Sequence, residues 1–175
     1  MANERVTENL VREQFRALGY HRSENTTVVE EQKSEIESVK RLLKAASKTG
    51  KGGIGSPEFI ISDKSTPDFL LIVECKASTK HHESVQHDDP AFFALDGALH
   101  YASSLAKEFD VIAVAVSGQT KSQLKVSTFL HAKGAPAAKP LSTKDGAPLL
   151  GSFRGQITSS TQHSILQFSA LDTKI

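Results

Sequence analysis

The chain has 175 residues, a single cysteine and a formal net charge of +1. This length suits one hydrophobic core, and one cysteine excludes an internal disulfide framework and a cysteine-rich zinc site. The sequence has no apolar run long enough to cross a bilayer, and its first residues lack the apolar core of a signal peptide. We therefore expect a soluble, cytoplasmic protein with no membrane partner.

Two amphipathic helices and a short strand are predicted in the first part of the chain. The first helix covers residues 3–18 and ends at Gly19, a residue type that favours the left-handed conformation of a helix C-terminus. Its predicted apolar face consists of Val6, Leu10, Ala17 and Leu18. Residues 26–29 fit an edge strand, and residues 34–46 fit a second helix with its apolar side inward.

Basic residues outnumber acidic residues before the next predicted strands. From Lys33 to Lys51 the chain carries six basic and two acidic side chains. This excess is either an ordinary solvated surface or a contact with nucleic-acid phosphates, for which Lys44, Lys48 and Lys51 are the candidates. The glycine-rich residues 48–55 do not fit a phosphate loop, because a proline and a strand follow them instead of a helix.

The middle of the chain predicts a β-hairpin. Residues 59–61 and 69–73 are short runs of β-branched, aromatic and aliphatic residues with turn formers between them. The second run is so apolar that we expect it at the centre of a sheet. Alternation along this strand places Glu74 and Lys76 on one face. Cys75 lies on the other, wholly apolar face, which predicts a packing role rather than a nucleophile.

The charged residues at one end of the hairpin predict a metal site. Antiparallel pairing brings Glu58 opposite Glu74 and Lys76, where opposed Cβ atoms lie ~5 Å apart. Two carboxylates at this separation can hold Mg²⁺, or Mn²⁺, with the backbone carbonyl of Cys75 as a further ligand. Lys76 would stabilise the pentacovalent transition state, so the residues indicate metal-assisted hydrolysis of a phosphodiester.

A polar loop, a helix and two strands are predicted beyond the hairpin. Residues 79–89 are rich in histidine and acidic side chains, but their spacing matches no zinc site, which favours a mobile loop that can close over a substrate. A helix from Asp89 to about Lys107 leads into a strand at residues 111–116, which we expect to be buried on both sides and parallel to a neighbour. Residues 124–131 fit a further edge strand.

Pro57-Glu58 at the start of one strand and Glu74-Cys75-Lys76 at the end of the next resemble the motif of the PD-(D/E)XK nucleases. This resemblance implies an α/β fold with a restriction-endonuclease-like core, a central mixed sheet flanked by helices in the order αβββαβ. Glu58 stands where these nucleases more often carry aspartate. Pro67-Asp68 also spells the motif, but six residues on one strand separate Asp68 from Glu74 by roughly 20 Å. We therefore assign Asp68 to the turn and keep it as the second candidate.

The resemblance also implies roles for two helical residues. A glutamate on the first helix of these nucleases commonly points into the active site, and Glu8 occupies that place, with Glu4 as the second choice. A solvated ion pair between Glu8 and Arg12 explains the same residue equally well. Tyr101 matches a tyrosine of the family, but Gly97 replaces the polar residue that usually precedes it by one turn. Tyr101 is therefore more simply a core residue, with a catalytic role as the alternative.

The helix and strand between Ala94 and Gly118 narrow the resemblance to the N-terminal nuclease domain of type IIG and related type I restriction-modification enzymes. This implies a Mg²⁺-dependent DNA endonuclease domain at residues 1–157, with residues 158–175 as a terminal helix or the start of a linker to methyltransferase or specificity domains. Double-stranded DNA and a second copy of the chain would be its partners. The alternatives are a catalytically inactive DNA-binding or docking module on the same fold, and a DNA-repair or RNA nuclease.

Overall fold

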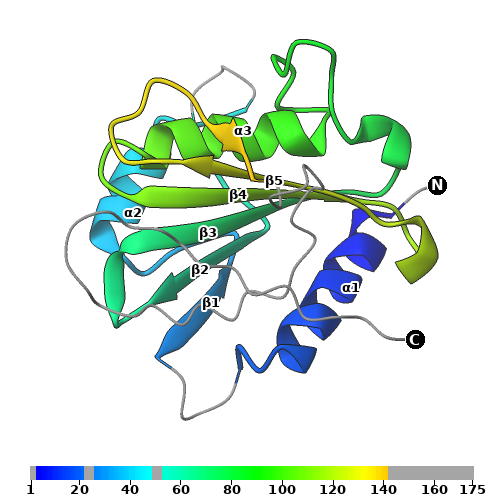
Figure 1. The fold of residues 1–175 in the computed structure, drawn as a ribbon, viewed down its shortest axis with the longest axis horizontal. Helices are drawn as coiled ribbons and strands as arrows, with labels where there is room; N and C mark the ends of the chain where they lie inside the picture. Colours follow the sequence, from blue (N-terminus) through cyan, green and yellow to red (C-terminus); the bar gives the residue numbers. More distant parts are fainter. Residues whose placement is uncertain (1–2, 22–25, 49–52, 142–175) are drawn as a thin grey trace.

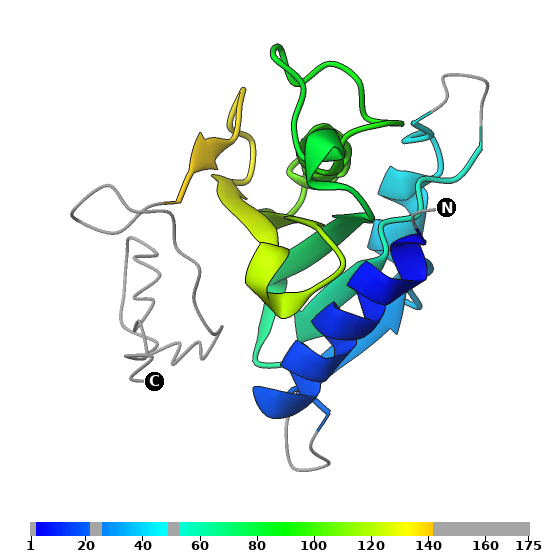
Figure 2. The same ribbon diagram turned by 90° about the vertical axis from the view of Figure 1, so that its right-hand side faces the viewer.

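The computed structural model describes residues 3–21, 26–48 and 53–141. In chain order its elements are α1 (Glu4–Ala17), β1 (Thr27–Glu31), α2 (Glu37–Leu43), β2 (Phe59–Asp63), β3 (Thr66–Lys76), η1 (Thr79–His81), α3 (Ala94–Leu105), β4 (Asp110–Ser117), η2 (Lys121–Gln123), β5 (Lys125–His131) and β6 (Lys139–Pro140). The strands form one open, mixed sheet in the order β1-β2-β3-β4-β5-β6. Helix α1 covers one face, and α2 and α3 cover the other (Figure 1; Figure 2). The predicted α/β class is confirmed, while residues 142–175, with the predicted terminal helix, lie outside the described residues.

Strand β3 lies at the centre of the sheet, as its apolar sequence predicts. It pairs antiparallel with β2 and parallel with β4, and every residue from Leu70 to Lys76 is buried. Strand β4 is the predicted buried, parallel strand. The predicted edge position is confirmed for β1. It is wrong for β5, because the two-residue strand β6 pairs with its outer side.

Alternating side chains of β3 divide the interior into two cores. Leu70 and Ile72 pack with α2 and α3 on one face. Leu71, Val73 and Cys75 pack toward α1 on the other face. Because burying each of these aliphatic side chains contributes roughly 1.5–3 kcal/mol, both faces of the sheet must remain covered for the domain to be stable.

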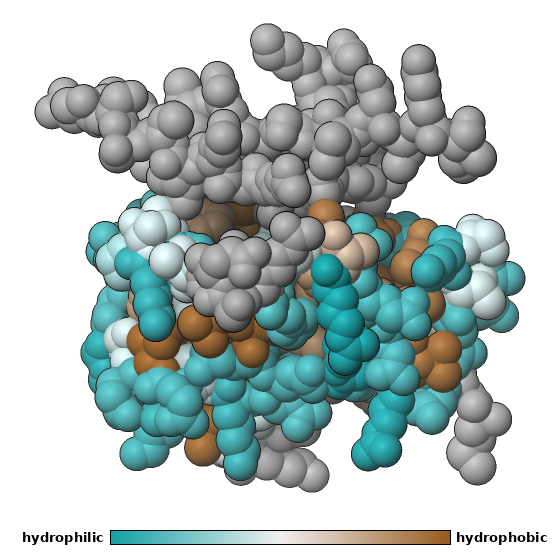
Figure 3. Space-filling model, turned by 90° about the horizontal axis from the view of Figure 1, so that it is seen from below, coloured by the Kyte–Doolittle hydropathy of each residue, from teal (hydrophilic) through white to brown (hydrophobic). Residues whose placement is uncertain are grey.

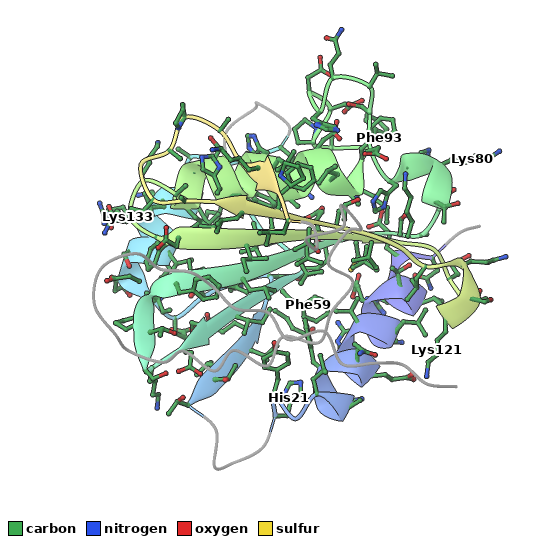
Figure 4. All side chains as sticks on the ribbon, in the orientation of Figure 1. His21, Phe59, Lys80, Phe93, Lys121 and Lys133 are labelled. Carbon is green, nitrogen blue, oxygen red and sulfur yellow. The ribbon has the colours of Figure 1, made fainter. Side chains whose placement is uncertain are left out.

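Helix α1 buries a different face from the predicted one. Its buried residues are Thr7, Val11 and Phe15, while Val6 is 38% exposed. Phe15 packs edge-on against Phe59, with 5.4 Å between the ring centroids, and Phe59 points from β2 toward the helix (Figure 4). The prediction left out the apolar residues Val11 and Phe15, and the Thr7 hydroxyl is buried in line with them because it bonds to backbone carbonyl groups at the strand ends.

Both remaining helices begin later than predicted, because carboxylates hold the preceding residues in turns. Before α2, Glu30 accepts hydrogen bonds from the Ser34 hydroxyl and the Glu35 amide, both at 2.6 Å. Before α3, the buried Asp96 carboxylate accepts hydrogen bonds from the backbone amides of Ser84, at 3.1 Å, and Asp89, at 3.0 Å. The chain therefore enters each helix through a fixed turn.

Residues 79–89 include an anchor to the sheet that their polarity did not predict. His82 is 1% exposed, with Nδ1 2.8 Å from the Ser117 hydroxyl and Nε2 2.9 Å from the Ser127 hydroxyl. Burial lowers the pKa of His82 from 6.5 to about 4. A neutral imidazole between two hydroxyl groups therefore connects the start of this segment to β4 and β5.

The His82 contacts predict a loss of stability in mild acid. Because the pKa of His82 is lower in the folded state, its contribution is complete above the unfolded pKa of 6.5 and is lost as the pH falls toward 4. We expect wild-type stability to fall by up to about 3 kcal/mol over this range, and His82→Ala to remove most of that dependence. Urea unfolding across the range measures both. His81→Ala, a change at an exposed neighbour, should keep the wild-type profile, and an unaltered profile in His82→Ala contradicts the assignment.

The surface that the described residues present from below is mainly hydrophilic, with small and separate hydrophobic groups (Figure 3). Among these residues no helix combines the length and the apolar character needed to cross a bilayer.

Candidate metal and catalytic site

Glu58 and Glu74 lie opposite each other at one end of the β2–β3 hairpin. Phe59 of β2 pairs with Val73 of β3, so the next antiparallel position joins residues 58 and 74. The sequence predicts Glu58 opposite Glu74 and Lys76, and a register shift between Ser62 and Asp63 sets the observed pairing with residue 74. Glu74 is fully buried on the central strand, while Glu58 is partly exposed just before β2.

The two carboxyl groups form an acidic pair in which each contributes a buried oxygen. Burial, and next the charge of Glu58, raise the pKa of Glu74 well above its ordinary value. Glu58 Oε2 and Glu74 Oε2 are buried and have no hydrogen-bond partner within the described part of the chain. Such oxygens cost free energy unless a cation or a proton donor meets them. The residues present therefore fit a hard divalent cation, which prefers oxygen ligands.

The ammonium group of Lys48 already reaches this acidic pair. It forms an ion pair with Glu74 Oε1 and lies 5.2 Å from the ring centroid of Tyr101. Its side chain is 17% exposed. Burial acts to lower the pKa of Lys48, but the attraction of Glu74 outweighs it and raises the pKa to about 12. Of the three lysines predicted to contact DNA, Lys48 thus lies in the site, Lys44 is exposed and Lys51 lies outside the described residues.

Lys76 lies at the end of β3 and contacts the first turn of α1. Its Nζ is 3.2 Å from Oε1 of Glu4, and its side chain is 11% exposed. The Thr7 hydroxyl lies 2.7 Å from the Gly118 carbonyl oxygen and 3.3 Å from that of Lys76. Thr7 thereby holds the start of α1 against the ends of β3 and β4, which places Glu4 beside Lys76.

Glu8 is engaged by a different partner. Its carboxylate pairs with Arg12 at 3.1 Å, and Arg12 also binds Glu31 at 2.7 Å. Burial and the charges of four carboxylates raise the pKa of the Cys75 thiol. These are, in decreasing order of effect, Glu58, Glu74, Glu8 and Glu4. Glu8 is therefore held by Arg12, and the direct contact with Lys76 belongs to Glu4, the second choice from the sequence.

Helix α3 lies close to Glu74 at a glycine residue, Gly97. A Cβ atom at Gly97 would lie 3.1 Å from Cγ of Glu74 and 3.0 Å from the carbonyl oxygen of Pro90. Tyr101, one turn later, packs in the core as predicted, and its hydroxyl accepts a hydrogen bond of 3.1 Å from the Ser56 amide. Tyr101 therefore holds the chain two residues before Glu58.

The contact between Gly97 and Glu74 predicts a cost for any side chain at this position. We expect Gly97→Ala to lower the free energy of unfolding by about 1–3 kcal/mol, although alanine is the better helix former. Urea unfolding measures the change. Ser103→Ala, at an exposed position of the same helix, should be nearly neutral. Equal stability of Gly97→Ala and the wild type contradicts the close packing.

Asp68 lies away from the acidic pair. It is exposed near the start of β3, whereas Glu74 is buried near the end of the strand. Its predicted place in the turn is wrong, because the turn consists of Lys64 and Ser65. The Asp63 carboxylate accepts a hydrogen bond of 2.8 Å from the Ser65 amide and so provides the turn chemistry.

The site offers two side chains as metal ligands, Glu58 and Glu74. No group of three or more histidine, cysteine, aspartate or glutamate side chains suited to a metal ion occurs in residues 3–21, 26–48 and 53–141. A cation at Glu58 and Glu74 would therefore need backbone oxygens, such as the Cys75 carbonyl, and solvent.

Comparison with known proteins found no match among protein-family models, curated proteins or solved structures. The likeness to PD-(D/E)XK nucleases accordingly remains an expectation drawn from the motif.

Proposed function

We propose that this chain is a Mg²⁺-dependent DNA endonuclease domain with a restriction-endonuclease-like core. One observation supports this above the others. Glu58 and Glu74 face each other at the end of the hairpin, each with one buried oxygen that has no hydrogen-bond partner among the described residues, and Lys76 follows on the central strand. A hard cation and an adjacent ammonium group are the components that hydrolysis of a phosphodiester requires. The same components serve DNA-repair and RNA nucleases.

Each residue has a separate task in this proposal. Glu58, Glu74 and the Cys75 carbonyl oxygen hold the ion. Mg²⁺, or Mn²⁺, supplies Lewis-acid chemistry, neutralising charge on the phosphate and making water more acidic. Lys76 stabilises the negative charge that develops on the phosphate oxygens. Glu4 is a positioning residue, because it accepts the hydrogen bond from Lys76 Nζ at 3.2 Å.

The partners of the domain follow from the same proposal. Sequence specificity comes from methyltransferase or specificity domains that are joined to the chain or bound by it. A second copy of the chain would allow both strands of a DNA duplex to be cut together, because one site hydrolyses one phosphodiester at a time.

Incubation of the full chain with supercoiled plasmid tests the activity. We expect nicked or linear DNA with Mg²⁺ or Mn²⁺ and intact plasmid with EDTA. A parallel assay with single-stranded RNA separates a DNA nuclease from an RNA nuclease. Intact plasmid under all metal conditions tells against the proposal.

A DNA-binding or docking module without catalysis is the second candidate function. The Lys48–Glu74 ion pair favours it, because an ammonium group already neutralises one carboxylate of the site. Gly97, where the resembled family carries a polar residue, is consistent with it. This candidate predicts salt-dependent DNA binding in EDTA, measured by mobility shift, together with no cleavage when metal is added.

A further inference from the structure

The Lys48 ammonium group forms an ion pair with Glu74, one of the two carboxylates proposed to hold the metal. We infer that the Lys48 ammonium and a divalent cation compete for the Glu58–Glu74 pair, so that Lys48 fills the site in the absence of metal and metal binding displaces it. This inference rests on the proposed function and adds a regulatory step to it.

The charges of the site favour replacement of the Lys48 ammonium group by a divalent cation. One ammonium group compensates one of two carboxylates, and Glu58 Oε2 and Glu74 Oε2 remain buried without a partner among the described residues. A divalent cation would compensate both carboxylates and contact the oxygens that Lys48 does not reach. The acidic pair should therefore prefer the divalent ion once its concentration is sufficient.

In the Lys48–Glu74 ion pair, Glu74 is held in place and Lys48 can move. Glu74 lies in the central strand, is fully buried and packs against Gly97. Lys48 lies beyond α2 and its C-cap Lys44, outside any helix or strand, and is partly exposed. Its four-carbon stem has several rotatable bonds, so the ammonium group can leave without any change in the sheet.

Lys76 is less free to move than Lys48. It is part of β3, and Glu4 of α1 holds its ammonium group. Lys76 therefore stays beside the site during the exchange, while Lys48 moves to its rim and becomes available to the phosphate of a substrate. This reconciles the contact of Lys48 with Glu74 with the DNA contact that the sequence predicts for it.

Calorimetric titration with Mn²⁺ at about pH 8, where protons compete least for the carboxylates, tests the competition. The full-length wild type is compared with Lys48→Met, Lys48→Gln and the exposed control Lys44→Met. We expect both Lys48 variants to bind Mn²⁺ about tenfold more tightly, a coupling of typical size, and Lys44→Met to match the wild type. Thermal melts establish that the variants are folded.

The outcomes separate this inference from the proposed function. Equal or weaker Mn²⁺ binding by both folded Lys48 variants overturns the competition and leaves the proposed nuclease standing. Binding by the Lys48 variants but not by the wild type supports the competition and argues against activity of the unmodified chain. Absence of Mn²⁺ binding in every protein overturns both.

Discussion

Lys76→Ala is expected to lower the rate of metal-dependent plasmid cleavage by about 10²- to 10³-fold, the usual cost of removing a group that stabilises transition-state charge. The ammonium group lies at the end of the central strand, two residues beyond Glu74, and Glu4 fixes it at 3.2 Å. Initial rates of nicking at saturating Mg²⁺ measure the effect.

Lys80→Ala is the matched control for Lys76→Ala, since it removes an exposed lysine four residues away. It should cleave at the wild-type rate. Mn²⁺ affinity should be similar in both variants, because neither lysine is a ligand. Cleavage by Lys76→Ala at the wild-type rate would falsify the catalytic role of this residue.

The double variant Lys48→Met/Glu74→Gln should be inactive and more stable than the wild type. Burial and the charge of Glu58 raise the pKa of Glu74. The contribution of Glu74 to the free energy of unfolding is therefore complete at a pH below its ordinary pKa of 4.5. This contribution is lost as the pH rises through the pKa that Glu74 has in the folded state. Replacing the buried ion pair by uncharged side chains of similar size should raise the free energy of unfolding by about 1–3 kcal/mol near neutral pH.

Urea unfolding at neutral pH and plasmid cleavage measure the two effects of the double variant. Lys48→Met alone serves as the comparison, and it should be less stable than the double variant because it leaves the Glu74 carboxyl without its cation. If the double variant is less stable than the wild type, the ion pair serves the fold, and the idea that its charges are retained for function is wrong.

The hairpin could be predicted from local sequence, but its register at the site could not. The turn pairs Asp63 with Thr66, and an uninterrupted ladder from there would place Phe59 opposite Leu70. A register shift between Ser62 and Asp63 places Phe59 opposite Val73, and therefore Glu58 opposite Glu74. The central position of β3 follows from the same sequence, because only a strand covered on both faces has so few polar residues.

Contacts between residues far apart in the sequence could not be predicted, because they depend on how the whole chain folds. Lys48 and Glu74 are 26 residues apart, and no periodicity links them. Glu4 rather than Glu8 meets Lys76 because a polar residue, Thr7, belongs to the buried face of α1. The apolar residues Val11 and Phe15, four positions apart, are the signal that could have found this face, and Thr7 extends it by one turn.

His82 was missed for a similar reason. Its neighbours in the sequence are polar, which suggested an exposed loop, but its two partners come from the ends of β4 and β5. Only the parallel pairing of β3 with β4 brings Ser117 near this histidine.

Binding of Mn²⁺ to the full chain, followed by calorimetry in the wild type, Glu58→Gln and Glu74→Gln, tests the metal site most directly. We predict saturable binding by the wild type and affinity at least about 100-fold weaker in each variant, since ligand losses exceed the cost of outer-shell changes. Saturable binding of equal strength in all three proteins would contradict a cation site between these two carboxylates.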